Sequence, residues 1–183
     1  YDIFPGSRHV SRMITLEGVP SPNLGDVPPQ ETIRKMQRDL PFYGGTPIEL
    51  REGERARDVL ADRAREKMSR STGADLHGLS TSECLDAIEY FLFPNLVPWA
   101  GHGAPICYRF RPHGNDPQMS VMEIMLLFAK PDDGPCPPSA AMTWLEVDQP
   151  WTDAPELGAA AEVIEQDTDN LLRIQRGLRA SHK

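Results

Sequence analysis

The chain has 183 residues, a formal net charge of -8 and a sequence pI near 5.1. That length suits one compact domain and is short for two. The negative net charge argues against nucleic acid or an anionic membrane surface as the main partner, because both are negatively charged and would repel the protein. No apolar run approaches the length that spans a bilayer, and no charged-then-apolar leader opens the chain, so we expect a soluble protein.

Three cysteines, an odd number, stand far apart in the sequence: Cys84, Cys107 and Cys136. None has the CxxC or CxH spacing of a zinc or iron–sulfur site, and no disulfide framework is indicated. A cytoplasmic location fits this pattern best. Because the chain begins at Tyr1, without Met and in a strand-like segment, we expect it to be a piece of a longer polypeptide.

The first half of the chain predicts one strand and two helices. Residues 8–17 alternate apolar and polar side chains, as a strand does, and a cluster of Pro and Gly follows. Residues 29–40 predict a helix with Ile33, Met36 and Leu40 on one side. Residues 53–73 predict a charge-rich surface helix that ends at Gly73. Only four of its side chains are placed to pack: Val59, Leu60, Ala64 and Met68.

The second half changes to a β pattern. Three apolar runs, 85–99, 104–117 and 118–131, are separated by Gly, Pro, Asn and Asp, which predicts an antiparallel meander. A proline-rich loop follows, and a final helix is expected from about Pro155 to Arg179. The predicted fold class is α+β, a curved antiparallel sheet closed by a C-terminal helix.

Asp167 interrupts the apolar stripe of this final helix. The stripe contains Ala160, Val163, Leu171, Ile174 and Leu178, with spacings of 3, 8, 3 and 4. Three other carboxylates, Glu162, Glu165 and Asp169, project to the opposite side and are expected to be solvated. We therefore expect Asp167 to point toward the sheet. A buried carboxylate needs compensation, which leaves three readings: a frayed helix that reaches solvent, a buried pair with Arg109 or Arg111, or a metal ligand or catalytic acid.

Several motifs in order resemble a known family. They are the opening RHVSRMITLEGVPSP, FPN at Phe93–Asn95, YRFRPHGND at Tyr108–Asp116, and the helix EQDTDNLLRIQRGL. Together they resemble the C-terminal half of the catalytic domain in the alpha subunit of Rieske non-heme iron aromatic-ring-hydroxylating oxygenases. The similarity covers nearly the whole chain.

The resemblance implies a helix-grip (START/Bet v1-like) fold, truncated at its N-terminus, so that residues 1–183 form a partial catalytic domain. It implies a mononuclear Fe(II) bound by two His and one carboxylate, and alignment of EQD…N…Q puts that carboxylate on Asp167. The family's two His ligands and its Rieske cluster ligands precede the segment seen here. No HxxxH pair occurs, and all five His are interpreted as structural or solvated: His9, His77, His102, His113 and His182.

The substrate of that family lies over the iron, between the sheet and the C-terminal helix. The resemblance therefore makes seven residues candidates for the substrate-binding wall: Val163, Leu171, Phe93, Asn95, Leu96, Val97 and Trp99. Ordinary core packing is the alternative for each one, and Phe93–Asn95 can equally form a bend with Asn95 satisfying local backbone groups. Arg109 and Arg111 are expected to be solvated or in salt bridges.

The implied enzyme inserts oxygen from O₂ into an aromatic or similarly apolar substrate. Its electrons come from NADH through a reductase or ferredoxin chain and a Rieske [2Fe–2S] cluster, and the parent is expected to be a trimer or an alpha–beta hexamer. The isolated chain is expected to bind no iron tightly and to have no activity. The alternative is a non-catalytic helix-grip domain that binds an apolar ligand and uses Asp167 as a paired acid.

Overall fold

The computed structural model describes residues 2–21, 23, 25–39, 45–158 and 160–181. Although the length led us to expect one domain, the chain divides into two compact units, Tyr1–Cys136 and Pro137–Lys183. We call them the N-terminal unit and the C-terminal unit. Within the part of the chain that is described, the N-terminal unit holds a sheet and three α-helices, and the C-terminal unit holds one long helix with two short 3-10 turns.

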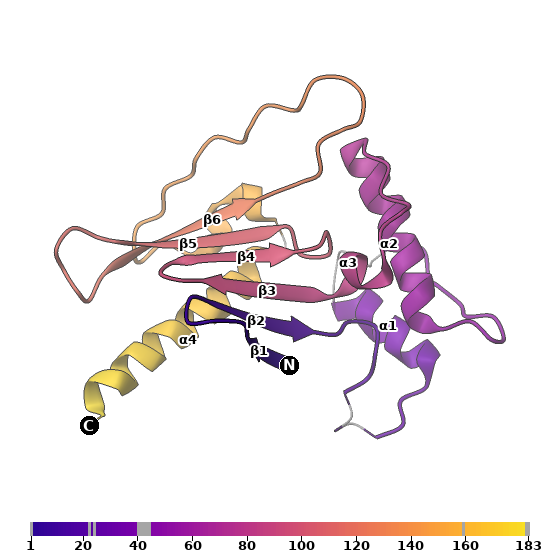
Figure 1. Ribbon diagram of the computed structural model, residues 1–183, viewed down its shortest axis with the longest axis horizontal. Coiled ribbons are helices and arrows are strands. Elements are labelled where there is room, and N and C mark those ends of the chain that lie inside the picture. The colour runs from indigo at the N-terminus through magenta and orange to yellow at the C-terminus, as the bar shows by residue number, and fades with distance from the viewer. Residues whose placement is uncertain (1, 22, 24, 40–44, 159, 182–183) are drawn as a thin grey trace. The chain divides into compact units, whose positions relative to one another are not determined.

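The N-terminal unit contains a six-stranded antiparallel sheet (Figure 1). Its strands are β1 (Asp2–Pro5), β2 (Val10–Thr15), β3 (Ala87–Leu92), β4 (Leu96–Ala100), β5 (Ile106–Pro112) and β6 (Ser120–Leu126). They pair in chain order, and each pair is antiparallel. The α+β class and the antiparallel meander are confirmed. Short turns join β1 to β2 and β3 through β6, whereas β2 pairs with β3 although the three helices lie between them in the chain.

The strand register assigns side chains to two faces of the sheet. Val10 lies opposite Leu92, Leu92 opposite Leu96, and Leu96 opposite Arg109. Because side chains alternate along a strand, the three arginines of the strands share this face with them, and we name it the arginine face: Arg12, Arg109 and Arg111. The other face, the Trp99 face, carries Val97, Trp99 and Tyr108.

A helical cluster provides the buried core of the N-terminal unit. It is built from α1 (Pro29–Asp39), α2 (Ala56–Thr72) and the short α3 (Thr81–Leu85). The charge-rich helix that we expected to lie on the surface is central to it, since α2 contributes Ala56, Leu60, Ala61, Ala64 and Met68. Gly73 ends α2 in the left-handed conformation, with φ of 75°, as the sequence predicted. Leu40, expected in the first helix, lies outside the described residues.

Helix α3 was not predicted, although its capping signature is present in the sequence. The Ser80 side chain accepts a hydrogen bond from the Glu83 backbone N–H, and the Glu83 carboxylate accepts one from the Ser80 backbone N–H. The turn after β4 approaches this helix closely. A Cβ at Gly101 would lie 2.8 Å from the Glu83 carbonyl oxygen, and the His102 N–H donates to that oxygen at 2.7 Å. Glycine at position 101 therefore lets the sheet dock against α3.

The C-terminal unit contains the 3-10 turns η3 (Trp151–Asp153) and η4 (Pro155–Leu157) and the helix α4 (Ala160–Ala180). The expected helix is therefore present, and the segment from Pro155 forms a separate 3-10 turn. Trp151 fixes η3 to the first turns of α4. Its backbone N–H donates to the Glu165 carboxylate at 2.7 Å, and its indole N–H donates to the Thr168 hydroxyl at 2.9 Å.

Candidate functional site

The FPN motif forms the turn between β3 and β4. Asn95 extends the pairing of β4 with β5, because its side-chain N–H₂ donates to the Phe110 carbonyl oxygen at 2.8 Å and its own carbonyl accepts from the Phe110 N–H at 2.9 Å. Phe93 is 61% exposed and contacts the His9 ring. The motif thus forms the bend that the sequence left open as an alternative, although Asn95 satisfies backbone groups of the neighbouring strand β5 and not local ones.

The three candidates on β4 do not share one face. Leu96 is on the arginine face, whereas Val97 and Trp99 are on the Trp99 face. Val97 is buried, and the Trp99 ring meets the Tyr108 ring edge to face with centroids 6.4 Å apart. The Trp99 indole N–H is buried and has no hydrogen-bond partner among the described residues. A single wall on the sheet can therefore include Val97 and Trp99 but not Leu96.

The expected order of exposure among the α4 carboxylates is wrong. Asp167 is exposed, while Glu165, which we expected to be solvated, is half-buried and accepts the Trp151 N–H. Val163 and Leu171 are also exposed, at 57% and 47%. The buried positions are instead Ala161 and Ile164. Two hydrogen bonds from Trp151, to the side chains of residues 165 and 168, fix which side of α4 the C-terminal unit covers, and helical periodicity contains no information about them.

Asp167 has an open carboxylate. No described residue forms a hydrogen bond or an ion pair with it, whereas Asp169 has Arg173 at 3.9 Å, as the i,i+4 spacing predicted. Arg109 and Arg111, considered as partners for Asp167, both bind Glu123 across β5 and β6. The hydrogen bond from Arg109, and then the one from Arg111, hold the pKa of Glu123 below its ordinary value. The expected salt bridges of these two arginines are confirmed.

Among the residues with described side chains, the buried acid is Asp86, which the sequence patterns did not identify. It caps the C-terminus of α3 just before β3 and is 1% exposed. Arg57 of α2 binds it through two nitrogens, at 2.7 and 2.6 Å. Ser82 donates to it at 2.6 Å and the Glu17 backbone N–H at 3.1 Å. The sequence signal for this buried acid was its position between a capping-box helix and an apolar strand. Its partner, Arg57, could not be identified from local spacing because it lies 29 residues earlier in the chain.

This cluster joins the sheet to the helical core. Arg57 also donates to the Glu17 carbonyl oxygen, just after β2. Burial alone raises the pKa of Asp86, but the hydrogen bonds from Arg57, Ser82 and Glu17 outweigh it and the pKa lies below its ordinary value. Burial, and then the charge of Asp86, raise the pKa of Glu17 above its ordinary value. The contributions of the two carboxyl groups to the free energy of unfolding therefore change with pH in opposite directions.

The pH dependence of unfolding should separate these two groups. The stabilisation from Asp86 is present above its unfolded pKa, near 3.8, and is lost as pH falls through its lower folded pKa. The stabilisation from Glu17 is present below its unfolded pKa, near 4.5, and is lost as pH rises through its higher folded pKa. We expect Glu17→Gln to become more stable relative to wild type as pH rises above 4.5, measured by urea unfolding at stepped pH. A difference that does not change with pH would contradict this.

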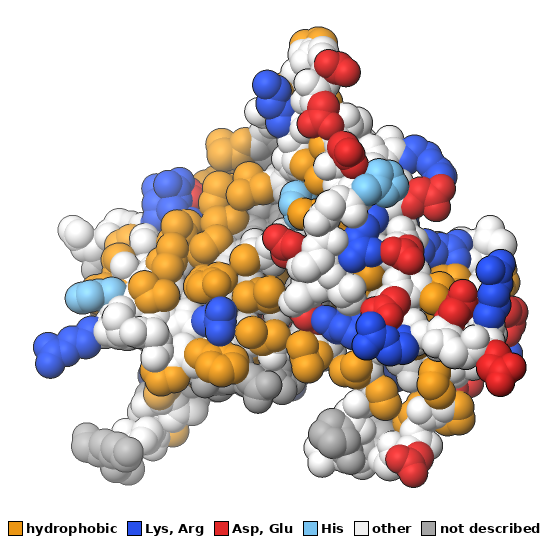
Figure 2. Space-filling model, turned by 45° about the vertical axis from the view of Figure 1, so that its right-hand side comes forward, with side chains coloured by type: hydrophobic (Ala, Val, Ile, Leu, Met, Phe, Trp, Pro, Cys, Tyr) orange, Lys and Arg blue, Asp and Glu red, His pale blue; other side chains and the backbone are white. Residues whose placement is uncertain are grey.

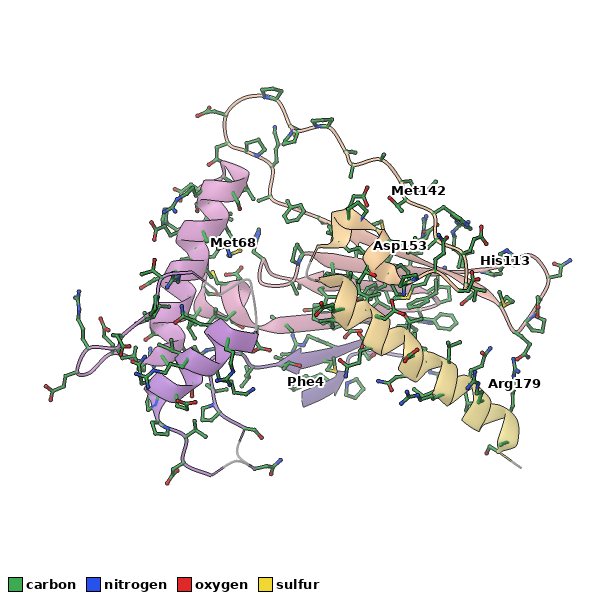
Figure 3. All side chains as sticks on the ribbon, turned by 180° about the vertical axis from the view of Figure 1, so that it is seen from behind. Phe4, Met68, His113, Met142, Asp153 and Arg179 are labelled. Carbon is green, nitrogen blue, oxygen red and sulfur yellow. The ribbon has the colours of Figure 1, made fainter. Side chains whose placement is uncertain are left out.

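The described residues contain no group of three or more His, Cys, Asp and Glu side chains arranged to hold a metal ion. His9, His77 and His113 are exposed, and His102 is half-buried; Figure 3 shows His113 in the turn after β5. His182 lies outside the described residues. Cys84 and Cys107 are buried, and burial raises the pKa of both thiols. Cys136 is exposed.

Comparison of the chain with protein-family models finds no match, and comparisons with curated proteins and with solved structures find no significant one. Among the described helices, none combines the length and the apolar character needed to cross a membrane. The functional assignment therefore depends on the motifs and on where they lie in the two units.

Proposed function

We propose that this chain is the C-terminal part of the catalytic domain of a Rieske-type ring-hydroxylating oxygenase alpha subunit. The observation that carries the proposal is the order in which the motifs occur along the chain, each on a defined element. FPN forms the β3–β4 turn, YRFRP lies in β5, and EQD…N…Q lies in α4. The proposal includes the helix-grip arrangement, in which a C-terminal helix covers one face of an antiparallel sheet.

In this proposal Asp167 is the carboxylate ligand of a mononuclear Fe(II). Its side chain is exposed and no described residue binds it, so the carboxylate is open to a metal. Fe(II) accepts carboxylate oxygen together with two imidazoles, and the remaining positions bind O₂. The chain provides one of the three protein ligands, Asp167. The two His ligands are proposed to come from the part of the polypeptide that precedes Tyr1.

The proposed reaction inserts oxygen into an aromatic or similarly apolar substrate. NADH supplies two electrons through a reductase or ferredoxin chain and a Rieske cluster. Either both atoms of O₂ enter the substrate, or one enters and the other leaves as water. The iron would supply O₂ activation, and this chain would supply an apolar surface that orients the substrate. Because Val97 and Trp99 share a face, they are the β4 residues proposed to contact it.

The reading frame that encodes Tyr1 tests the proposal directly. We expect it to continue upstream through a segment like DxxHxxxxH, which would provide the two His ligands, and through CxH…CxxH, which would hold the Rieske cluster. A start codon immediately before Tyr1 would overturn the assignment. The activity test incubates the full-length polypeptide with reductase, NADH and ¹⁸O₂, with naphthalene, biphenyl or benzoate as the probe substrate. The measured quantity is the ¹⁸O incorporated into the product.

The isolated 183-residue chain is expected to bind no iron tightly. One carboxylate without converging imidazoles does not offset the cost of removing water from Fe(II). We expect less than about 0.1 iron per chain after anaerobic loading with Fe(II) and desalting, and no NADH-dependent oxygenation of the three probes. Iron near one per chain in the wild type would show that another set of ligands exists in this chain.

A further inference from the structure

The arginine face of the sheet is apolar apart from a few charged residues. Six aliphatic side chains on it are half-buried: Val10, Ile14, Ile88, Leu92, Leu96 and Val121. Figure 2 shows hydrophobic side chains gathered over the strands. Contiguous apolar surface of this kind marks an interaction site more often than a solvated face.

Arg12 lies on this apolar face and is held in place by two rings. In the register it lies between Phe4 of β1 and Tyr90 of β3, and its guanidinium carbon is 4.9 Å and 6.0 Å from their ring centroids. Its Nε is buried and unpartnered, and within the described part of the chain no hydrogen bond or ion pair reaches the guanidinium. A buried donor that lacks an acceptor costs about 1 to 3 kcal/mol. A carboxylate on the partner would satisfy it.

The charges of the arginine face exclude a symmetric contact with itself. Three arginines, Glu123 and Asp2, which the register places opposite Ile14, give the face a net charge of +1. Two such faces would repel each other, so the partner has to bring acidic groups.

The chain itself carries an acidic and apolar segment that is open to solvent. Residues 142–148, MTWLEVD, belong to the long loop after β6, on which Figure 3 labels Met142. Met142 is 86% exposed, Val147 83% and Trp144 54%. Glu146 and Asp148 are exposed as well, and the chain has no Lys or Arg between residues 132 and 169. Exposed aromatic and apolar side chains beside carboxylates complement an apolar face that contains an arginine.

We propose that residues 142–148 of a second copy dock on the arginine face, with Glu146 or Asp148 of that copy bound to Arg12. The contact is heterologous, because the two copies use different surfaces, and it builds rings or chains of subunits. It does not depend on the proposed oxygenase function. A seven-residue segment buries less area than a standard interface, so the association is weak and needs protein concentrations of about 0.1 to 1 mM.

Sedimentation velocity of the full chain at low salt tests the proposal. We expect concentration-dependent association that Arg12→Glu weakens at least tenfold and that high salt also weakens. Arg8→Glu makes the same charge change in the β1–β2 turn and should alter association less than twofold. The double variant Glu146→Gln/Asp148→Asn should match Arg12→Glu, whereas Asp153→Asn, in η3, should match wild type. A monomer at all concentrations, or equal effects of Arg8→Glu and Arg12→Glu, would overturn it.

Cross-linking identifies which copy provides the segment. Arg12→Lys keeps a positive charge at position 12 and introduces a primary amine. A carbodiimide couples this amine to a neighbouring carboxylate as an amide. In an equal mixture of ¹⁴N and ¹⁵N chains, we expect mixed-isotope cross-links from position 12 to Glu146 or Asp148. Cross-links only within one isotope would show that the chain's own segment reaches Arg12, and no cross-link to either acid would exclude the contact. Both outcomes overturn the proposal.

Discussion

Arg57→Ala is expected to lower the free energy of unfolding by about 3 to 5 kcal/mol, because it leaves the buried Asp86 carboxylate without its cation. Only Ser82 and the Glu17 backbone N–H would then donate to a group that is 1% exposed. Arg57→Lys keeps the charge but loses the two-nitrogen geometry, so an intermediate loss is expected. Urea unfolding followed by circular dichroism measures all three proteins.

Arg55→Ala is the matched control for this prediction. Arg55 lies just before α2 and pairs with Asp58 on the surface, where its side chain is 81% exposed. Its loss should cost no more than about 0.5 kcal/mol, since exposed ion pairs contribute little. If Arg57→Ala and Arg55→Ala destabilise the chain equally, the Arg57–Asp86 pair does not hold the helical core to the sheet.

Asp167→Ala is expected to abolish turnover in the full-length oxygenase of which this chain is proposed to be the C-terminal part. Removal of one of three protein ligands leaves Fe(II) without a complete facial triad, so we expect kcat to fall at least about 100-fold. Asp169→Ala, two residues further along α4, should retain nearly full activity, because Asp169 makes only a surface pair with Arg173. NADH consumption coupled to product formation measures both variants, and similar activities would contradict the assignment.

The sheet could be predicted because its signals are local. Alternating side chains predicted strand β2, and turn residues between apolar runs predicted three antiparallel strands in the region of β3 to β6. The first run, 85–99, forms two strands, β3 and β4, because the FPN turn divides it. Strand β1 was recognised only as a strand-like start of the chain and was given no bounds, because its four residues, DIFP, end in Pro and give too short an alternation. Helix α3 was missed because five residues show no periodicity, although the Ser80–Glu83 capping box was visible.

The environment of the candidate site depended on contacts that sequence periodicity does not contain. Asp167 stood on an apolar stripe and was expected to be buried, yet Trp151 binds residues 165 and 168 and turns a different side of α4 inward. The acid that is buried, Asp86, meets Arg57 from a helix 29 residues earlier. Non-local pairs of this kind require the fold before they can be identified, whereas the i,i+4 pair of Asp169 with Arg173 needed only helix geometry.

Mononuclear iron per subunit in the full-length polypeptide tests the central proposal most directly. Elemental analysis gives total iron, and the Rieske contribution of two irons per cluster is subtracted after spectroscopic quantification of that cluster. We expect about one mononuclear iron per subunit in wild type and in Asp169→Ala, and less than about 0.1 in Asp167→Ala with the Rieske cluster intact. Full mononuclear iron in Asp167→Ala would show that Asp167 is not the ligand.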